Sequence, residues 1–561
     1  MSPHCGRLGD RSLVALLIVA AAGCGPGASA PAPGPAGQAP DAAETPGGVF
    51  RDVTGAARID FVHRLADGHL DNIVEAVGSG GAWLDYDGDG RLDLVLVQPG
   101  WSDLVCKGEK PDRLATNRLY RNRGDGTFED ATAQSGLGRP GFGVAAAAAD
   151  YDGDGRVDLY VVNDGPNVLW RNRGDGSFED VTDRAQVGDA GCGAAATWFD
   201  ADGDGRPDLY VANYLTLDPN YRLYHSPDGF PGPLAYEAQP HVLYRNRGDG
   251  TFEDVSEASG VRAGPGRGMG VCAFDYDGDG RGDLFVANDA TAHFLFHNEG
   301  GRFAEVGVRA GAAFGLMGEG TAAMAGIPGD YDRDGLPDLF VSDATYCSLY
   351  RNLGKGLFQD RALAAGVSGP AAVSPSWGAA WLDFDDDGDL DLVVAKGDLH
   401  HMNGYTDLLL ENRGDGTFSD ASLRGGGHFL REMNGRACLP ADFDDDGDID
   451  VLLTNLHDRP VLLRNESAHA NAWITLTLRG ISPNTPAFGA KVVVEAGGRR
   501  QFAEMRCPTG YLGQGDPRLH FGLGTAQKAD RIEIRWPSGA TSQLRDVRAR
   551  QFLSVSEESQ R

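Results

Sequence analysis

The chain has 561 residues and a formal net charge of −31, with 81 Asp and Glu against 50 Lys and Arg. This excess of negative charge argues against a protein that binds nucleic acid or an anionic membrane through a basic patch. The length also exceeds that of one ordinary compact domain, although an array of repeats escapes this limit because each unit packs on the next.

The N-terminal 24 residues are predicted to be a secretory signal. Two arginines precede the apolar run 13–22, which is too short to span a bilayer, where about 20 apolar residues are needed. The segment resembles a bacterial lipoprotein signal in which Cys24 would be lipidated. Such signals usually carry Leu where this chain has Ala21, so cleavage by the ordinary signal peptidase is the alternative. Residues 25–48 are rich in Pro, Gly and Ala and are predicted to be a linker.

An acidic pattern of nine residues then recurs seven times, and each copy runs directly into aliphatic residues. Aspartates occupy positions one, three, five and nine, and Gly occupies position six. Carboxylates at alternate positions of a curled loop converge, and the carbonyl of position seven can add another oxygen. Hard cations select such oxygen ligands, while the absence of a recurrent His or Cys argues against zinc. Calcium fits better than magnesium, which keeps more water. The sequence therefore predicts about seven Ca²⁺ sites, formed by Asp85, Asp87, Asp89, Arg91 and Asp93; Asp150, Asp152, Asp154, Arg156 and Asp158; Asp200, Asp202, Asp204, Arg206 and Asp208; Asp275, Asp277, Asp279, Arg281 and Asp283; Asp330, Asp332, Asp334, Leu336 and Asp338; Asp383, Asp385, Asp387, Asp389 and Asp391; and Asp442, Asp444, Asp446, Asp448 and Asp450.

The first nine positions also match the start of an EF-hand loop. An EF-hand requires a bidentate Glu at position twelve and a helix on each side. Position twelve is aliphatic in every copy: Leu96, Val161, Val211, Val286, Val341, Val394 and Leu453. These residues belong to a predicted buried strand, so the EF-hand is excluded.

Two further pieces recur between the acidic loops. The first is Leu-x-x-Asn, as in 119–122, and the second is Phe-x-Asp or Phe-x-Glu, as in 128–130. A Gly-Asp-Gly turn joins them, which predicts a tight hairpin. Together with a small-residue strand before the loop, such as 143–149, and an aliphatic strand after it, such as 159–162, each repeat supplies four strands. The prediction is an all-β, seven-bladed β-propeller over residues 49–467.

The count of these pieces predicts how the ring closes. After Asn465 no Phe-x-Asp piece follows, but a matching segment, Val49 to Thr54, stands at the N-terminal end of the repeats. We expect this segment to supply the last strand of the seventh blade. Closure of this kind removes exposed sheet edges.

Three irregular segments interrupt the repeats and are candidate binding surfaces. They are the insertions 98–117 and 214–242, the second with Tyr214, Tyr221, Tyr224, His225 and Tyr236, and the pair His400-His401. The aromatic insertion could equally cap the central channel. For the histidine pair a hydrogen-bonding role within the loop is favoured over a metal site.

Two other motifs receive ordinary structural interpretations. Four Arg-Gly-Asp tripeptides coincide with the predicted hairpin turns, so turn chemistry explains them better than integrin recognition. The cysteines show no zinc spacing. Export would permit disulfides, but those that lie in small-residue runs before acidic loops are predicted to be buried, unpaired residues, namely Cys192, Cys272 and Cys438.

The stretch from Gly141 to Asn163, with its GFG and DYDGDGRVDLYVVN segments, resembles the FG-GAP/VCBS repeat of integrin α-subunit propellers and of many secreted bacterial proteins. Residues 468–557 are predicted to form a small antiparallel β domain, and FGA at 488–490, HFGLG at 520–524 and WPSG at 536–539 resemble the ASPIC/UnbV domain. The combination resembles the cartilage acidic protein 1-like family. The FG-GAP/VCBS likeness implies calcium in the blade loops, a location outside the cytoplasm, and binding or adhesion, whereas the cartilage acidic protein 1-like family adds little further chemistry.

The sequence thus predicts a calcium-binding module for a protein or glycan ligand, lipid-anchored in the bacterial cell envelope or secreted, and monomeric. No GxSxG, HExxH or Cys/His arrangement is present, so an enzyme is not expected. A carbohydrate-active enzyme or a lectin on the same scaffold is the alternative. Seven equivalent loops indicate a structural role for the metal, so the activity is expected where the repeat is interrupted or in the C-terminal domain.

Overall fold

The computed structural model describes residues 48–558 apart from 222–228, 263, 265 and 468–469. The predicted signal with Cys24, nearly all of the predicted linker, and Tyr224 and His225 of the second insertion lie outside the described residues. Within the part that is described, no helix has the length and apolar character needed to cross a membrane.

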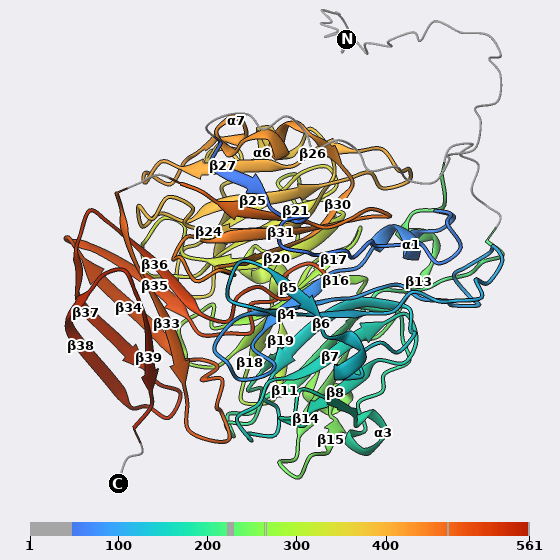
Figure 1. Ribbon diagram of the computed structural model, residues 1–561, viewed down its shortest axis with the longest axis horizontal. Coiled ribbons are helices and arrows are strands. Elements are labelled where there is room, and N and C mark those ends of the chain that lie inside the picture. The colour runs from blue at the N-terminus through green and yellow to red at the C-terminus, as the bar shows by residue number, and fades with distance from the viewer. Residues whose placement is uncertain (1–47, 222–228, 263, 265, 468–469, 559–561) are drawn as a thin grey trace, which may run out of the picture. The chain divides into compact units, whose positions relative to one another are not determined.

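Seven antiparallel four-stranded sheets form the predicted propeller (Figure 1). The small-residue strand predicted at 143–149 is confirmed with the same bounds, and the strand predicted at 159–162 is one residue longer at each end. The first three blades are β2 (Gly81–Leu84), β3 (Asp93–Leu96), β4 (Arg118–Asn122) and β5 (Phe128–Asp130); β6 (Gly143–Ala149), β7 (Asp158–Asn163), β8 (Val168–Asn172) and β9 (Phe178–Asp180); and β10 (Gly193–Phe199), β11 (Asp208–Asn213), β14 (Val242–Asn246) and β15 (Phe252–Asp254).

The remaining blades repeat this order. They are β16 (Gly268–Phe274), β17 (Asp283–Asn288), β18 (Phe294–Asn298) and β19 (Phe303–Glu305); β20 (Ala323–Gly329), β21 (Asp338–Asp343), β22 (Ser348–Asn352) and β23 (Phe358–Asp360); β24 (Ser376–Leu382), β25 (Asp391–Lys396), β27 (Leu408–Asn412) and β28 (Phe418–Asp420); and β30 (Gly435–Ala441), β31 (Asp450–Asn455), β32 (Val461–Asn465) and β1 (Phe50–Asp52). In every blade the position-nine Asp is the first residue of the second strand. Position twelve therefore lies in a buried strand, as the exclusion of the EF-hand requires.

The predicted closure of the ring is confirmed. Strand β1 pairs antiparallel with β32, with Phe50 opposite Asn465 and Asp52 opposite Leu463. In Figure 1 the blue β1 lies among the orange strands of the seventh blade. Phe50 is buried against Phe384 and Phe429, with ring centroids about 6 Å away. The first and last segments of the propeller thus share one sheet and one patch of core.

Deletion of Val49 to Thr54 is expected to lower the melting temperature sharply. The deletion removes the ladder hydrogen bonds of β1, uncovers the edge of β32 and exposes the pocket filled by Phe50. Thermal unfolding followed by circular dichroism measures the effect. Phe50→Ala, which keeps the strand, should cost about 3–5 kcal/mol. A deletion variant that melts with the wild type would contradict this account of closure.

Short helices, which the all-β prediction did not include, connect some of these strands. They are α1 (Ile73–Val77), α2 (Thr132–Ser135), α3 (Thr182–Ala185), α4 (Ser256–Ser259), α5 (Gly307–Ala310), α6 (Ser368–Ala371), α7 (Ser422–Gly425), η1 (Pro233–Ala235) and η2 (Gly427–Leu430). Two small sheets, β12 (Leu215–Thr216) with β13 (Glu237–Ala238) and β26 (Tyr405–Thr406) with β29 (Glu432–Met433), stiffen connecting loops.

The C-terminal domain, red in Figure 1, contains two sheets around its own core. One sheet has the order β36 (Leu519–Gly524), β33 (Ala472–Arg479), β39 (Gln551–Ser556), and the other β35 (Arg499–Glu504), β34 (Lys491–Ala496), β37 (Lys528–Arg535), β38 (Thr541–Arg548). The domain was predicted to be antiparallel, but β33 and β39 pair in parallel. The two strands come from opposite ends of the domain, so no hairpin constrains their direction.

A loop of the C-terminal domain, residues 505–516, fills the centre of the propeller; we call it the central loop. Gln514 pairs with the first blade, since its backbone N–H donates to Gly81 O at 3.0 Å and its carbonyl accepts from Trp83 N at 3.2 Å. Its side chain accepts from Ala148 N of the second blade at 2.7 Å. Thr509 Oγ1 contacts the third and fourth blades, 3.1 Å from both Thr197 Oγ1 and Val271 O.

The same loop reaches the other three blades. Arg506 Nη2 donates to Pro328 O at 2.8 Å in the fifth blade. The ring of Tyr511 packs 5.6 Å from that of Trp377 in the sixth, and Asp516 N donates to Pro440 O at 2.9 Å in the seventh. The inner strands are rich in Gly and Ala because the chain approaches closely here. The sequence did not predict this contact.

The antiparallel blades give the propeller two different ends. The acidic loops and the Gly-Asp-Gly turns join first to second and third to fourth strands, so they share one end, which we call the acidic end. The insertions 98–117 and 214–242 and the loop with His400 join second to third strands, so they lie at the opposite end, which we call the insertion end. The C-terminal domain contacts the acidic end, for example where His520 Nε2 lies 2.8 Å from Asp386 Oδ1.

Candidate functional site

The seven acidic loops share one backbone geometry. The position-six Gly has a positive φ of 82° to 98° in every copy, a conformation that only Gly adopts readily, and its N–H donates to the position-one carboxylate at 2.7–3.0 Å. The position-seven N–H donates to the position-five carboxylate at 2.9–3.0 Å. The spacing read in the sequence is therefore the spacing of a tightly curled loop.

The position-nine Asp connects each loop to its blade. Asp93 accepts the N–H of Asn122 at 2.7 Å with one oxygen and the N–H of Tyr86 at 3.1 Å with the other, and the six equivalents repeat both bonds. These aspartates are almost fully buried. Each carboxylate thus fixes the loop, the second strand and the third strand relative to one another.

Carboxylates converge within the first four loops. In the first three loops, oxygens from positions one, three and nine lie within 4.8 Å of one another, as for Asp85, Asp87 and Asp93. Buried oxygens of Asp152, Asp330 and Asp444 have no hydrogen-bond partner, so they remain available to a cation. A hard, oxygen-seeking divalent ion fits this donor set. The position-five carboxylate instead contacts arginine in several loops, as Asp89 contacts Arg91 at 2.9 Å.

Burial and mutual repulsion act strongly on these carboxyls. Burial raises the pKa of Asp93 to about 8 and those of Asp283 and Asp338 to about 9, and neighbouring loop carboxylates add to the rise. Burial likewise raises the pKa of Asp442 to about 8, although the Arg518 guanidinium opposes the rise. The folded chain therefore holds loop carboxyls that keep protons at neutral pH unless positive charge is supplied.

The seven loops are not equivalent in their surroundings. In four blades an arginine from the third strand of the blade, or from α7, contacts the position-three Asp, as Arg121 contacts Asp87 at 2.5 Å. The fourth loop has His297 there, 3.3 Å from Asp277 and 3.4 Å from Asp283. Lys491 of the C-terminal domain also forms an ion pair with Asp275 of this loop. The basic side chains that contact the loop carboxylates therefore differ from one loop to another.

The asparagine of each Leu-x-x-Asn piece is a structural residue whose role was not assigned from the sequence. Asn172 Nδ2 donates to Tyr86 O at 2.7 Å, a bond that joins the second blade to the acidic loop of the first. All seven asparagines make the equivalent bond to the preceding blade, and Asn122 closes the circle on Phe443 O. The strict recurrence of Asn at this position was the available signal. Together these hydrogen bonds join each blade to its neighbour around the acidic end.

The Arg-Gly-Asp tripeptides occupy turns, as predicted. In the first, Gly124 and Gly126 have φ values of 71° and 76°, and Asp125 accepts the N–H of Thr127 at 3.0 Å. The turns with Arg173, Arg247 and Arg413 repeat this bond. Turn chemistry therefore accounts for the motif.

The cysteines of the described chain are all buried and unpaired, which confirms the interpretation of Cys192, Cys272 and Cys438. Cys106, Cys347 and Cys507 share this state. None of the six thus contributes a disulfide to the fold.

The structure brings together two of the predicted binding surfaces at the insertion end. Phe230 of the second insertion is buried against His400, with ring centroids 4.8 Å apart. The hydrogen-bonding role predicted for the histidine pair is carried by backbone groups, since His400 N donates to Asp398 Oδ1 at 3.0 Å while its Nδ1 has no partner. Tyr214 is buried and its hydroxyl donates to Asp289 at 2.6 Å, so it ties the start of the second insertion to the fourth blade.

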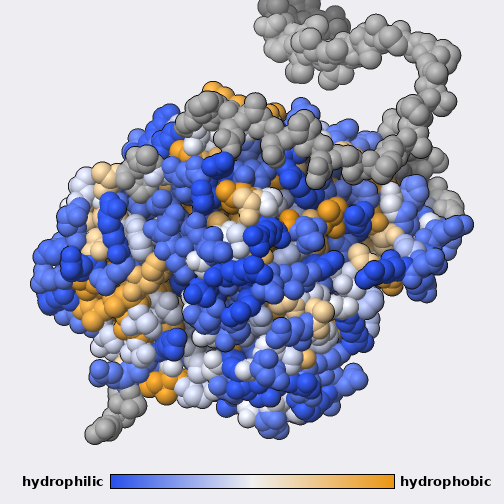
Figure 2. Space-filling view, viewed as in Figure 1, coloured by the Kyte–Doolittle hydropathy of each residue, from blue (hydrophilic) through white to orange (hydrophobic). Residues whose placement is uncertain are grey.

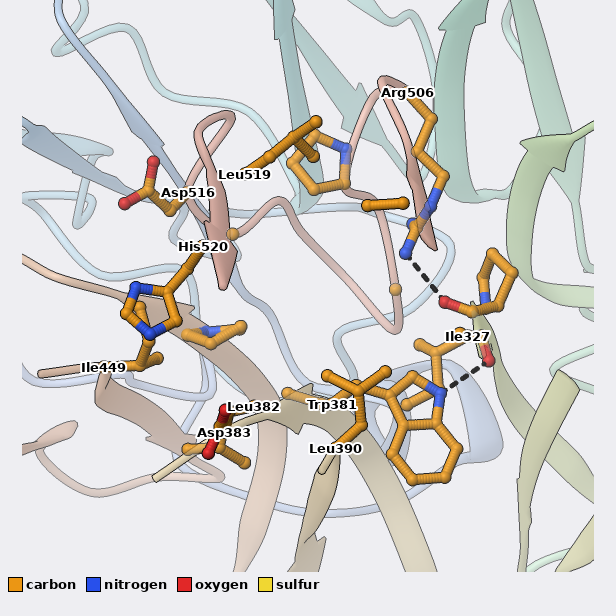
Figure 3. A pocket seen from close by; sticks show the side chains of 18 of the residues that line it. Ile327, Trp381, Leu382, Asp383, Leu390, Ile449, Arg506, Asp516, Leu519 and His520 are labelled. Atoms are coloured by element: carbon orange, nitrogen blue, oxygen red, sulfur yellow. Dashed lines mark hydrogen bonds between the residues drawn. The ribbon is translucent and has the colours of Figure 1, made fainter. Parts of the chain in front are cut away.

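A cavity of about 240 Å³ lies between blades five to seven and the C-terminal domain (Figure 3). Ile327, Trp381 and Leu390 supply much of its apolar wall. In Figure 3 Arg506 points to the carbonyl of Pro328, and Trp381 Nε1 donates to Ile327 O at 3.1 Å. Both of these polar groups are hydrogen-bonded within the protein. We therefore interpret the cavity as a gap in the packing beside the central loop.

Two family models match the chain. The FG-GAP-like repeat matches residues 85–161, 150–211, 234–286, 275–341, 330–394 and 383–453, and ASPIC and UnbV matches 480–561. Cartilage acidic protein 1 of Mus musculus is 27% identical over 496 residues, which cover 85% of this chain and 73% of the relative. The Homo sapiens protein of the same name is 26% identical over 481 residues, covering 82% and 69%.

Solved structures give weaker likenesses. An Agrocybe aegerita lectin that recognises non-reducing terminal N-acetylglucosamine has a TM-score of 0.40 and 18% identity, covering 68% of this chain and 86% of the lectin. BBS1N, in its complex with ARL6DN, has a TM-score of 0.41 and 10% identity, covering 75% and 99%. The repeat matches, by contrast, span more than half of the chain. The chain belongs to the family of FG-GAP-like repeat proteins, with an ASPIC and UnbV domain at its C-terminal end.

Proposed function

We propose that the protein is a calcium-stabilised binding module that works outside the cytoplasm and holds a protein or glycan ligand at its insertion end. The observation that carries the proposal is the division of the propeller into two ends. The acidic end is occupied by loops that hold the blades together and by contacts with the C-terminal domain, whereas the insertion end gathers the irregular loops. Long irregular loops on a rigid scaffold are common binding sites.

The role of calcium in this proposal is structural. Carboxylates of positions one, three and nine would bind the ion. Oxygens without a hydrogen-bond partner, such as Asp152 Oδ1, would then be coordinated to it. When bound, the ion neutralises the converging carboxylates. A charge of −31 and a largely hydrophilic visible face suit a medium rich in divalent cations (Figure 2). Export through the N-terminal signal, with lipidation at Cys24, would place the module in the cell envelope.

A glycan array, together with an assay for depolymerisation of the glycans bound, tests the proposal. We expect calcium-dependent binding without turnover. Phe230→Ala should abolish it because the ring supports the loop of His400. Arg123→Ala, an exposed turn residue at the acidic end, is the matched control and should leave binding unchanged. Loss of binding in Arg123→Ala alone would move the ligand to the acidic end. Release of oligosaccharides would instead favour a carbohydrate-active enzyme.

A further inference from the structure

A cluster of three potential metal ligands lies at the insertion end, away from the acidic loops. Asp67, Glu75 and Cys106 each offer one ligand atom, and these atoms all lie within 4.8 Å of one another. Asp67 belongs to the turn before α1, Glu75 to α1 itself and Cys106 to the first insertion. The three residues are thus brought together only by the tertiary fold.

Glu75 shows that this cluster is more than a chance grouping of acids. Its side chain is only 2% exposed, and Oε1 has no hydrogen-bond partner. The other oxygen, Oε2, accepts from Asp71 N at 2.8 Å and from Asn72 Nδ2 at 2.9 Å. A buried carboxylate oxygen without a partner is costly. Asp67 and Cys106 place a carboxylate oxygen and a sulfur beside this oxygen, and a cation is a partner that would satisfy all three ligand atoms.

The surrounding hydrogen bonds hold the three residues in place. Asp67 Oδ2 accepts from the N–H groups of Lys107 and Gly108, both at 2.9 Å, next to Cys106 in the chain. Asn72 Nδ2 also donates to Val105 O at 3.0 Å, on the other side of Cys106. The N-terminal turn and the first insertion are therefore tied together at the cluster. Such outer bonds orient metal ligands in established sites.

We propose that Asp67, Glu75 and Cys106 bind a divalent transition-metal ion of the zinc class, with an open fourth position for water or an external ligand. A thiolate with two carboxylates is a borderline donor set that suits zinc and its substitutes better than calcium. Tetrahedral bonds of about 2.0–2.3 Å place neighbouring ligand atoms about 3.5 Å apart, so only small side-chain shifts are needed. Binding converts the Cys106 thiol to a metal-bound thiolate and releases its proton to solvent.

Cobalt titration of the full-length protein in excess calcium tests this site, because calcium keeps the acidic loops filled and a thiolate–cobalt charge-transfer band reports sulfur ligation. We expect one equivalent of cobalt with this band, displaced by zinc. Cys106→Ser should abolish the band, and Glu75→Gln should weaken affinity at least about tenfold. The matched control Asp71→Asn removes an exposed carboxylate beside the site and should bind as the wild type does.

A wild-type protein without the band, or a band that survives in Cys106→Ser, would overturn the proposal. If Cys106→Ser fails to fold, as judged by circular dichroism, the alkylation rate of Cys106 in the wild type decides the question. Slower alkylation with zinc, read by mass spectrometry of the Cys106 peptide, supports the site, whereas an unchanged rate contradicts it. Neither readout depends on the ligand of the insertion end.

Discussion

Removal of calcium by EDTA is expected to lower the melting temperature by at least about 10 °C. An ion that binds the folded state alone stabilises it by about 2.7 kcal/mol when its concentration is one hundred times its dissociation constant, and seven loops offer such sites. Without the ion, converging carboxylates such as Asp85, Asp87 and Asp93 repel one another. Calorimetry with EDTA, followed by addition of calcium or magnesium, measures the effect. Restoration by calcium but not magnesium is the expected pattern.

One loop can be separated from the others by substitution. Asp152→Ala, which removes the position-three carboxylate of the second loop, should lower the calcium stoichiometry by one and leave the remaining sites filled. Asp183→Ala, which removes an exposed carboxylate of α3 in the same blade, is the matched control. Calorimetric titration compares the two variants. If EDTA leaves the melting temperature unchanged, the acidic loops stabilise the blades by hydrogen bonds alone and the calcium proposal fails.

The metal-free protein should also respond to pH in a defined direction. Burial raises the pKa of Asp93 to about 8 and of Asp338 to about 9 in the folded state, above the ordinary value near 4. The folded state therefore keeps protons that the unfolded chain has released. Stability from these groups is fully present below about pH 4 and is lost as pH rises to about 8 or 9. With calcium bound, this loss should disappear, since the ion replaces the protons. Melting curves from pH 5 to pH 9, with and without EDTA, test the difference.

Disruption of the central loop is expected to destabilise the propeller and the C-terminal domain together. Tyr511 is 1% exposed, packs on Trp377 and donates to Val77 O at 2.9 Å. Tyr511→Ala should therefore cost about 3–5 kcal/mol. Gly513→Ala tests the close approach to the first blade, because an added Cβ would lie 2.1 Å from Gly81 O. Urea unfolding followed by tryptophan fluorescence measures both variants.

Gly232→Ala is the matched control for the glycine variant, since an added Cβ there meets no atom within 4 Å. It should unfold as the wild type does. Because the central loop touches all seven blades, the two substitutions should also change the cooperativity of unfolding. Wild-type stability in Tyr511→Ala would show that the loop occupies the channel without supporting the blades.

The sequence by itself determined the blades, their number and their closure. Each acidic loop needs only nine neighbouring residues, and the left-handed backbone at position six explains Gly90 and its equivalents directly. The closing strand was predictable because one missing Phe-x-Asp piece in the last repeat matched one extra piece before the first. Turns such as Gly124-Asp125-Gly126 were predictable because their hydrogen bonds join residues close together in the chain.

Only the tertiary structure decided which segments meet across the propeller. The contact of Gln514 with Ala148 spans 366 positions, and neither residue belongs to a motif that specifies the other. The same holds for Phe230 with His400 and for Asp67, Glu75 and Cys106. Local patterns arise from turn geometry and strand alternation and can be read along the chain. Contacts between distant segments form only when the ring closes and brings those segments together at its centre or at its insertion end. They can therefore be seen only in the folded structure.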